Sequence, residues 1–504
     1  MPKFMTSRAQ RIIAGFFLVV LLVGNGFFLR YNAFRFFNTL DMGGYLDAAW
    51  RVYRGQVPFI DFMFHKIPLD LYLSALFFHL FGFGKAAVLA QMLTIHSVVI
   101  LLVFFMLYRR VPLYVTLAVT VLTVPSYYWS VSFPWHDQSA HLWSLIAVSL
   151  LVWQMPFKNG RRAFLCGAAC GFLSVVAFMI KTNIGPAYGL AFLVVLLTSP
   201  KRIKALGGFF AGIAVGIAAA LLLIRYPKEF FDQTAAYSMF DGARRLKALL
   251  DPRHWLVNYY WAAPVVVFGG IFFTRQKRPQ MTALFLSVTF VAIYCVITGG
   301  MIKPANNFLW GAQMALAFIV LYSHADPKMD QRARRFFVAA QTALLLMVIV
   351  LTVISIRYGL QLKAWTYNDD HPEGEYVLYA EPLKGWRFHL KDGLPLDQLS
   401  RFIKERVPPE DSILNLTDLY IIYALTDRDS FRGIPPFFFG NAFPAPGPQL
   451  ERVRETILKN SPDWIIVHFG GFDNELMFLR MGDMVRDDYV PIMRSGLYVL
   501  LRKK

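Results

Sequence analysis

The sequence predicts an α-helical polytopic membrane protein with about eleven transmembrane helices and a small C-terminal α/β domain. Of its 504 residues, 56% are hydrophobic, compared with about 45–50% in a typical soluble domain. The mean hydropathy is +0.45. Apolar runs long enough to cross a bilayer recur up to residue 356. From residue 357, charged residues, prolines and short apolar runs alternate, which is typical of a water-exposed domain.

The apolar runs define the predicted spans. They lie near 12–29, 86–108, 112–130, 139–156, 163–180, 184–199, 205–225, 256–274, 281–298, 308–324 and 336–356. The first run is longer than the apolar part of a signal peptide, and Arg30-Tyr31-Asn32 offers no small-residue cleavage site. We therefore expect it to be retained. Segment 69–83 is apolar but short and contains His79, so we expect an interfacial or re-entrant segment.

The basic residues indicate the orientation. The net charge is +19, but the charge lies in short clusters between apolar runs and forms no continuous face, so we expect no nucleic-acid partner. The clusters fall on every second connection, which predicts that these connections are cytoplasmic. They are Arg8 with Arg11, Arg109-Arg110, Lys158 with Arg161-Arg162, Lys201-Arg202, Arg275 with Lys277-Arg278, and Arg332 with Arg334-Arg335. An odd number of spans then puts the N-terminus inside and the C-terminal domain outside.

Two domains follow: a transmembrane domain over 1–356 and an extracytoplasmic α/β domain over 357–504. The outer loops near 30–85, 131–138 and 226–255 are the expected catalytic loops. Loops 30–68 and 226–255 are basic although they lie outside, which fits either an anionic lipid head group or solvated surface charge. In the C-terminal domain we expect strands at 412–416, 463–467 and 498–501 and a helix at 448–458.

Small and sulfur-containing residues inside the apolar runs predict packing. Cys166 and Cys170 are one helical turn apart, a spacing more typical of packing than of a disulfide or a metal site. Cys295 also lies in an apolar run. Glycines with small-residue spacing predict two helices that approach closely. They are Gly167 with Gly171, and Gly208, Gly212 and Gly216.

Carboxylates are concentrated in the first outer loop. Asp41 could be a general base at the membrane surface, or it could cap the helix predicted over 44–50. Its spacing favours neither. Asp47 lies further along that helix, and we expect a structural or solvated role for it. Asp61 could serve the site or only cap a turn.

Other polar residues in three outer loops could complete a site. Lys66 could pair with a phosphate or extend toward lipid head groups, and an isolated His65 is usually only hydrogen-bonded. His136 and Asp137 form a short loop, but two adjacent residues make a poor metal site. Lys181 occupies the next outer turn. Asp41, Lys66, Asp137 and Lys181 come from successive outer loops, so a helix bundle could bring them into one cavity.

These segments resemble the C-type (GT-C) membrane glycosyltransferases, in the branch of the bacterial aminoarabinose transferases and protein mannosyltransferases. The likeness lies in three outer loops of the first 200 residues. Its motifs are Asp41, Tyr45, Gly55 and Pro58, then Lys66-Ile67-Pro68, Leu80-Phe81-Gly82, Asp137 ahead of Ser139-Ala140-His141-Leu142, and Lys181-Thr182. Gly44 and His65 depart from the residues that often precede the tyrosine and the lysine in this family.

The resemblance implies a sugar donor on a polyprenyl monophosphate in a bacterial cytoplasmic (inner) membrane. It implies that Asp41 is the catalytic base and that Lys66 contacts the donor phosphate. We expect Lys181 and Arg244 or Arg245 to assist, with Asp137 as a second acidic residue of the site. Fixed cations can take the charge of the leaving group, so we expect no metal and no cofactor.

The function expected from these features is inverting transfer of a hexosyl or pentosyl group to an extracytoplasmic glycan, lipid or protein. The alternative is a lipid or solute carrier, or a flippase, that binds and moves its substrate with the same charges. Carriers often contain internal repeats and broken helices near the bilayer midplane. The sequence contains no clear repeat, and its charges cluster at one membrane face. A receptor with an outer domain is a weaker third option.

Overall fold

A computed structural model describes residues 7–35, 37–39, 41–64, 68–129, 133–157, 159–234, 247, 250–251, 279–298, 308–323, 331–361, 375–436, 448–469 and 481–504. The chain divides into two compact units. The first, called here the helical unit, comprises Met1–Asn32, Met92–Leu223 and Ala243–Tyr367. The second, the mixed unit, comprises Ala33–Gln91, Ile224–Gly242 and Asn368–Lys504. The predicted boundary at 356 and 357 stays a prediction.

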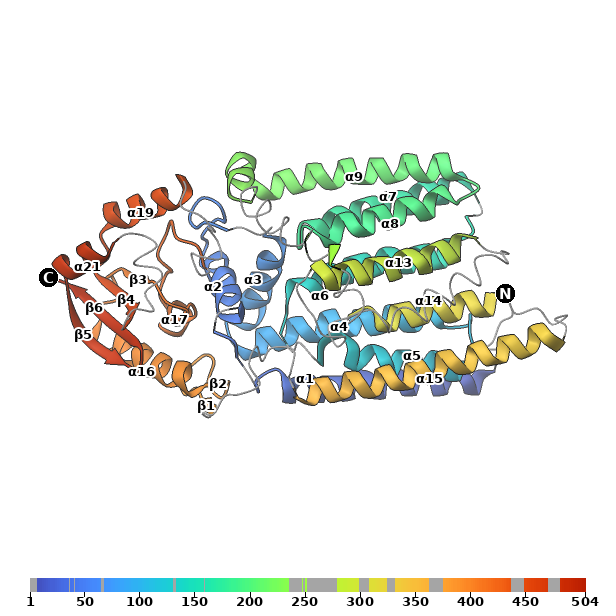
Figure 1. Cartoon of the computed structure of the whole chain (residues 1–504), viewed down its shortest axis with the longest axis horizontal. Coiled ribbons are helices and arrows are strands. Elements are labelled where there is room, and N and C mark those ends of the chain that lie inside the picture. Colours follow the sequence, from blue (N-terminus) through green and yellow to red (C-terminus); the bar gives the residue numbers. More distant parts are fainter. Residues whose placement is uncertain are drawn as a thin grey trace. The chain divides into compact units, whose positions relative to one another are not determined.

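The helical unit is built from apolar helices of different lengths (Figure 1). They are α1 (Arg8–Asn32), α4 (Lys85–Leu107), α5 (Leu113–Val124), the π-helix η1 (Pro125–Trp129), α6 (His136–Gln154), α7 (Gly160–Phe178), α8 (Ile184–Leu197), α9 (Arg202–Ile224), α13 (Pro279–Thr298), α14 (Trp310–Ser323) and α15 (Gln331–Gln361). Among the described residues, five helices are long and apolar enough to cross a membrane: α1, α4, α7, α9 and residues Gln331–Arg357 of α15. The others are shorter or less apolar.

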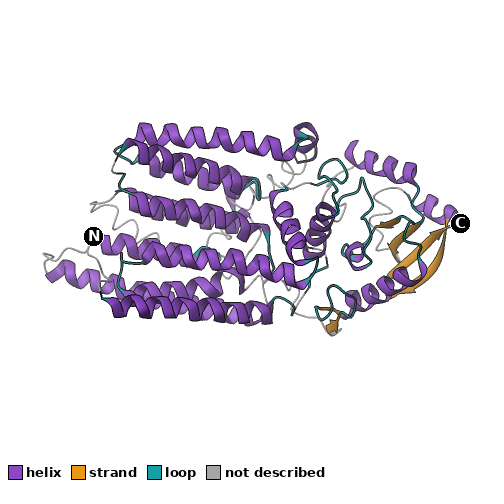
Figure 2. Ribbon diagram, turned by 180° about the vertical axis from the view of Figure 1, so that it is seen from behind, coloured by secondary structure: helices purple, strands orange, loops and turns teal. Residues whose placement is uncertain are grey.

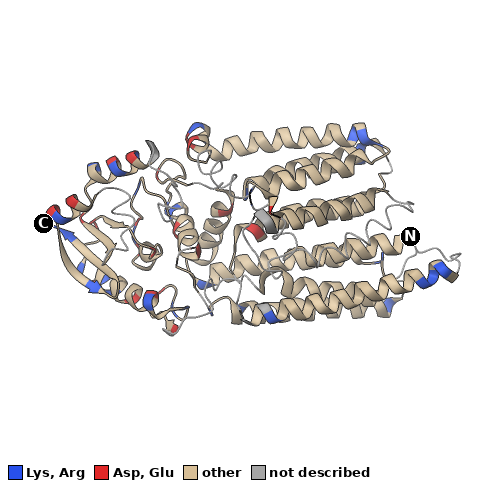
Figure 3. Cartoon of the chain, viewed as in Figure 1, with Lys and Arg blue, Asp and Glu red and all other residues tan. Residues whose placement is uncertain are grey.

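The predicted spans coincide with these helices, apart from the span near 256–274, which lies outside the described residues. The short segment 69–83 forms α3 (Leu69–Phe81), which is too short to cross a bilayer by itself. Figure 3 shows basic residues where α9 and α15 begin, which is where the clusters Lys201-Arg202 and Arg332 to Arg335 lie in the sequence. The polytopic helical architecture expected from hydropathy is confirmed.

Close approach between α7 and α9 explains the glycine spacing. A Cβ atom built on Gly167 would lie 2.0 Å from the carbonyl oxygen of Ala205, and one on Gly208 would lie 2.0 Å from that of Phe164. No side chain fits at such distances, so the backbones touch only because these residues are glycines. The predicted packing role is confirmed.

The mixed unit contains two sheets and short helices (Figure 2). Strands β1 (Glu375–Val377) and β2 (Arg387–His389) pair antiparallel. The larger sheet has the order β3-β4-β6-β5, with β3 (Ile413–Asn415), β4 (Trp464–His468), β5 (Tyr489–Ser495) and β6 (Tyr498–Lys503). Among the described strands of this sheet, β3 and β4 pair in parallel and the other pairs are antiparallel. The helices are α2 (Asp41–Tyr53), α3, α16 (Leu390–Arg406), α17 (Ile422–Leu425), α19 (Pro448–Asn460) and α21 (Gly482–Asp488).

The predicted strands at 412–416, 463–467 and 498–501 and the helix at 448–458 are confirmed as β3, β4, β6 and α19. The sequence did not predict β5 or α16, and both contain a proline. Pro491 lies where the pairing of β5 with β6 shifts register, on a strand at the edge of the sheet. A proline is tolerated there because an edge strand has a row of amides that need no ladder partner.

The chain leading into α2 pairs with the smaller sheet. The amide of Phe37 donates to the carbonyl of Arg387 (2.8 Å), and the amide of Arg387 donates to the carbonyl of Phe34 (3.0 Å). The ring of Phe37 packs against Trp386 and Phe388, with centroids 4.9 and 4.6 Å apart. The start of α2 is therefore attached to the C-terminal part of the mixed unit.

Candidate active site

Helix α2 begins at Asp41, and the amides of its first turn donate hydrogen bonds to Asn38. The amide of Asp41 donates to Oδ1 of Asn38 (2.9 Å), and the amides of Met42 and Gly43 donate to its carbonyl (both 3.1 Å). Asn38 thus supplies the side-chain oxygen expected of a helix cap. Asp41 is half-buried in the first turn, where the exposed amides of a helix favour negative charge.

Tyr45 lies one turn after Asp41 and joins α2 to α3. Its hydroxyl donates to Oδ2 of Asp70 (2.7 Å) and lies 2.8 Å from Oγ of Ser74, which in turn donates to Oε1 of Gln91 (3.0 Å). Burial, and then the charge of Asp70, raise the pKa of Tyr45 well above its ordinary value, so the hydroxyl keeps its proton. Asp70 was not predicted from the sequence.

Asp61 lies in a turn of the mixed unit. Its Oδ2 accepts the amide of Val57 (2.8 Å), and its Oδ1 lies 3.3 Å from Nη1 of Arg432. These contacts correspond to the turn-capping role, one of the two alternatives left open by the sequence.

In the helical unit, the structure brings together two of the predicted loops. Asp137 lies in the first turn of α6, and Lys181 lies between α7 and α8. The ammonium of Lys181 donates to Oδ1 of Asp137. The ring of His136 packs on Trp135, with centroids 4.2 Å apart, and its Nε2 lies 3.4 Å from Oδ2 of Asp137. Asp137 and Lys181 thus form an ion pair whose side chains are only 5% and 12% exposed.

One helical turn after Asp137, His141 adds a buried polar group that the sequence analysis did not assign to the site. It lies four residues after Asp137, on the same face of α6, and its Nδ1 is 3.3 Å from the hydroxyl of Tyr188. Both side chains are buried. The i, i+4 spacing of Asp137 and His141 was the signal that could have identified it.

The remaining predicted residues stay predictions. His65, Lys66, Arg244 and Arg245 lie outside the described residues. Asp41 and Tyr45 belong to the mixed unit, whereas Asp137 and Lys181 belong to the helical unit. The convergence of all these side chains in one cavity therefore also stays a prediction. Within the described part of the chain, no three His, Cys, Asp or Glu residues are grouped so that they could hold a metal ion.

Comparison with known proteins identifies the fold. No protein-family profile matches the sequence, and no curated protein sequence matches it. Among solved structures, the chain is similar to ArnT from Cupriavidus metallidurans bound to undecaprenyl phosphate, with a TM-score of 0.54, 13% identity and coverage of 98% of each chain. The same protein in the apo state matches with a TM-score of 0.54 and 13% identity over 96% of this chain and 97% of that chain.

A second similar structure is the archaeal oligosaccharyltransferase AglB from Archaeoglobus fulgidus, in complex with an inhibitory peptide and a dolichol-phosphate. Its TM-score is 0.51 at 9% identity, over 98% of this chain and 74% of that chain. At such low identities the likeness concerns the fold. The chain has the same fold as ArnT and AglB, which is the GT-C fold that the resemblance of its sequence motifs predicted.

Proposed function

We propose that this protein is an inverting membrane glycosyltransferase that moves a sugar from a polyprenyl-phosphate donor to an acceptor. One observation carries the proposal: the fold matches ArnT over 98% of both chains, in a structure that holds undecaprenyl phosphate. AglB, with its dolichol-phosphate, is a second protein of similar fold that binds a polyprenyl-type phosphate. A fold can host several functions, so the residues must supply the reaction.

Asp41 is the proposed general base. Its carboxylate takes the proton of an acceptor hydroxyl while the acceptor oxygen attacks the anomeric carbon and forms the new glycosidic bond. The bond from that carbon to the phosphate oxygen breaks in the same step. The polyprenyl phosphate leaves with the electron pair, and the configuration at the anomeric carbon inverts. The position of Asp41 supports this role, because Asn38 already supplies a side-chain cap at the start of α2.

Fixed cations stabilise the leaving phosphate in this scheme. Lys66 is the proposed main contact, with help from Lys181 and from Arg244 or Arg245. A lysine ammonium has three N–H donors, so the bond from Lys181 to Asp137 leaves donors for a phosphate oxygen. Asp137 would then orient Lys181.

The finer parts of the proposal concern substrate and location. The transferred group is a hexose or a pentose, and the acceptor is an extracytoplasmic glycan, lipid or protein.

The proposed location of the enzyme is a bacterial cytoplasmic membrane, with residues 357–504 outside the cytoplasm. An alkaline phosphatase fusion after Lys504 tests this orientation, because that reporter is active only outside the cytoplasm. An inactive phosphatase fusion together with an active cytoplasmic reporter would contradict it.

The activity itself is tested in vesicles containing the purified protein. Undecaprenyl-phosphate donors with radiolabelled hexose or pentose are supplied together with a cell-envelope extract as acceptor. We expect label on the acceptor and release of undecaprenyl phosphate in equal amount. Movement of intact labelled donor across the bilayer without cleavage would instead favour the carrier and overturn the proposal.

A further inference from the structure

One face of α2 contacts a segment from the C-terminal part of the mixed unit. This segment, residues 427–434, is called here the clamp segment. The contacting residues of α2 are Asp47, Trp50 and Arg51, at spacings that place them on a single helix face. Arg54, directly after the last residue of α2, also contacts the clamp segment. Gln56 continues the contact beyond the end of the helix.

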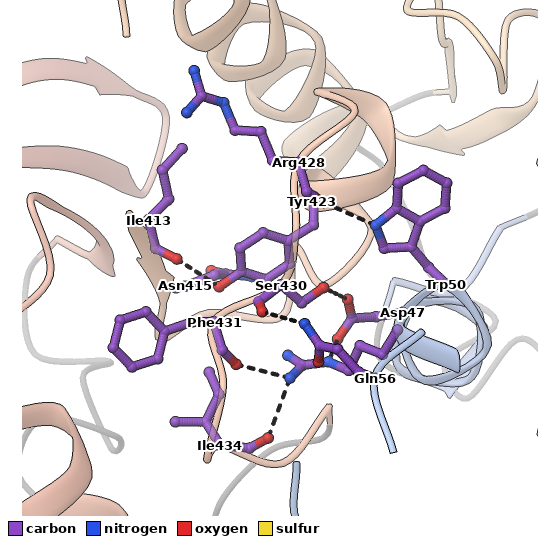
Figure 4. Close-up of polar contacts among 11 residues, drawn as sticks. Asp47, Trp50, Gln56, Ile413, Asn415, Tyr423, Arg428, Ser430, Phe431 and Ile434 are labelled. Carbon is purple, nitrogen blue, oxygen red and sulfur yellow. Dashed lines mark hydrogen bonds and ion pairs between the residues drawn. The ribbon is translucent and has the colours of Figure 1, made fainter. Parts of the chain in front are cut away.

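The contacts at the centre of this face all involve an ion pair within α2 (Figure 4). Nε of Arg51 donates to Oδ2 of Asp47 (2.8 Å). The other oxygen of Asp47 accepts the hydroxyl of Ser430 (2.7 Å). Nη1 of Arg51 donates to the carbonyls of Phe431 (2.9 Å) and Ile434 (3.4 Å). The planar guanidinium thus fixes the helix and the clamp segment in one geometry.

Two further bonds extend the contact on either side. The indole nitrogen of Trp50 donates to the carbonyl of Arg428 (2.9 Å), and the side-chain amide of Gln56 donates to the carbonyl of Ser430 (2.7 Å). These bonds reach backbone carbonyls of the clamp segment, so they constrain its path and not only its side chains. Arg54 adds an exposed ion pair with Asp429 (2.8 Å).

The central ion pair is fully buried. The side chains of Asp47 and Arg51 are each 1% exposed, and the guanidinium carbon lies 5.4 Å from the ring centre of Phe62 and 5.9 Å from that of Tyr423. Burial raises the pKa of Asp47, and the charge of Arg51 opposes that effect. Because two charges lose their hydration, such a pair often stabilises a fold no better than apolar residues of similar volume. What apolar residues could not supply is this fixed orientation.

The same helix carries Asp41 at its first turn. Asp47 follows Asp41 by six residues, which is about 9 Å along a helix. The C-terminal part of the unit also contacts the beginning of α2. The hydroxyl of Thr39 donates to Oδ2 of Asp418 (3.3 Å), and the Cβ position of Gly43 lies 3.8 Å from the ring of Tyr420. Helix α2 is therefore held at both ends.

We propose that the clamp segment sets the position of Asp41, with Asp47 and Arg51 as positioning residues. The inference rests on the proposed function, in which Asp41 is the base. The C-terminal domain then contributes to the rate without touching the reacting atoms. The expected effect is large for a contact this far away, because a misplacement of about 1 Å can slow a reaction by about 10²-fold.

The test replaces the ion pair by apolar residues. The double variant Asp47→Leu/Arg51→Met removes both charges, so neither is left buried alone. The matched control is Arg54→Gln/Asp429→Asn, which breaks the exposed pair between the same two segments. Each protein is assayed in vesicles for Tm and for kcat and donor KM with radiolabelled undecaprenyl-phosphate sugar.

We expect the double variant to keep its Tm and its donor KM and to lose about 10-fold or more in kcat. The control should keep all three values. A folded double variant with the kcat of the parent would overturn the inference, and so would a change confined to KM. A purely structural role would lower the Tm and would leave the kcat of the folded fraction unchanged.

If the double variant does not fold, two less disruptive substitutions at Ser430 test the same inference. Ser430→Ala removes the hydroxyl that donates to Asp47, and Ser430→Thr keeps a hydroxyl at this position. We expect a several-fold loss of kcat in the first and recovery in the second, and parental kcat in Ser430→Ala would overturn the inference. If Asp41→Asn is inactive while Asp47→Leu/Arg51→Met and Ser430→Ala have the kcat of the parent, the inference about the clamp segment is wrong and the proposed role of Asp41 stands. A parent without transferase activity overturns the proposed function and the clamp together.

Discussion

Asp41 and Asp47 are two carboxylates of one short helix with different surroundings. Asp41 is half-buried in the first turn, after a cap provided by Asn38. Asp47 is buried between Arg51 and Ser430. The comparison shows that the role of a carboxylate follows from what surrounds it and not from its distance to a motif. In our proposal Asp41 takes the proton of the acceptor, and Asp47 holds the helix that carries Asp41.

The largest expected effect comes from Asp41→Asn. Asparagine keeps the size and can still accept a hydrogen bond, but at neutral pH it cannot take a proton from the acceptor. General-base catalysis contributes about 10²–10⁴-fold, so kcat should fall by about that factor while Tm and donor binding stay unchanged. Asp429→Asn is the matched control in the same unit. If Asp41→Asn transfers sugar as fast as the parent, Asp41 is not the base.

The opposite pattern is expected for Asp47→Ala. This change leaves the guanidinium of Arg51 buried without its counter-ion, which should cost about 3–5 kcal/mol of stability. Thermal unfolding should show a large drop in Tm, whereas Asp41→Ala should change Tm little. Equal Tm values for the two variants would remove the distinction between a reactive and a structural carboxylate on α2.

Lys66→Ala should produce a smaller and different effect. Loss of a charge-assisted contact to the donor phosphate is worth roughly 1.5–3 kcal/mol, or about 10- to 150-fold in kcat/KM for the donor. Lys66→Arg should retain part of the activity because it keeps the charge. Titration of the donor at fixed acceptor measures both variants. Parental kcat/KM in Lys66→Ala would take Lys66 out of the site.

The smallest effect concerns Asp418, whose surroundings contrast with those of Asp47. Burial raises the pKa of Asp418, but hydrogen bonds from His468 and Tyr498 outweigh it, so the pKa lies below its ordinary value of 3.8. Its contribution to stability is therefore present above that value and lost as the pH falls through the folded-state pKa. The Tm difference between the parent and Asp418→Asn should shrink from about pH 5 to about pH 3. A constant difference would contradict this sign.

The sequence was sufficient for the features that depend on local pattern. Hydropathy located α1, α4 and α15, and short apolar runs between charged residues and prolines located β4 and β6. It could not locate β5, because Pro491 interrupts the strand pattern at a register shift that only pairing with β6 explains. In β5, tertiary contacts therefore determined the structure where the local strand preference was weak.

In the candidate site, too, some contacts were predictable from sequence spacing and others were not. Because Asp137 and Lys181 lie on successive outer turns, the sequence analysis expected the two side chains to lie close together, and the structure brings them into contact. The burial of Asp47 was not predictable, because its partner Ser430 lies 383 residues away. The i, i+4 spacing of Asp47 and Arg51 permits an ion pair, but the sequence analysis named no partner for Asp47, and nothing in the sequence indicated that a distant segment would cover it.

The measurement that tests the central claim most directly is the anomeric configuration of the product. It uses whichever labelled undecaprenyl-phosphate donor, hexose or pentose, gives the most transfer in vesicles, and nuclear magnetic resonance of the purified product reports the configuration. A single displacement assisted by Asp41 predicts inversion relative to the donor, with one polyprenyl phosphate released for each sugar transferred. A product that retains the configuration of the donor would contradict the account.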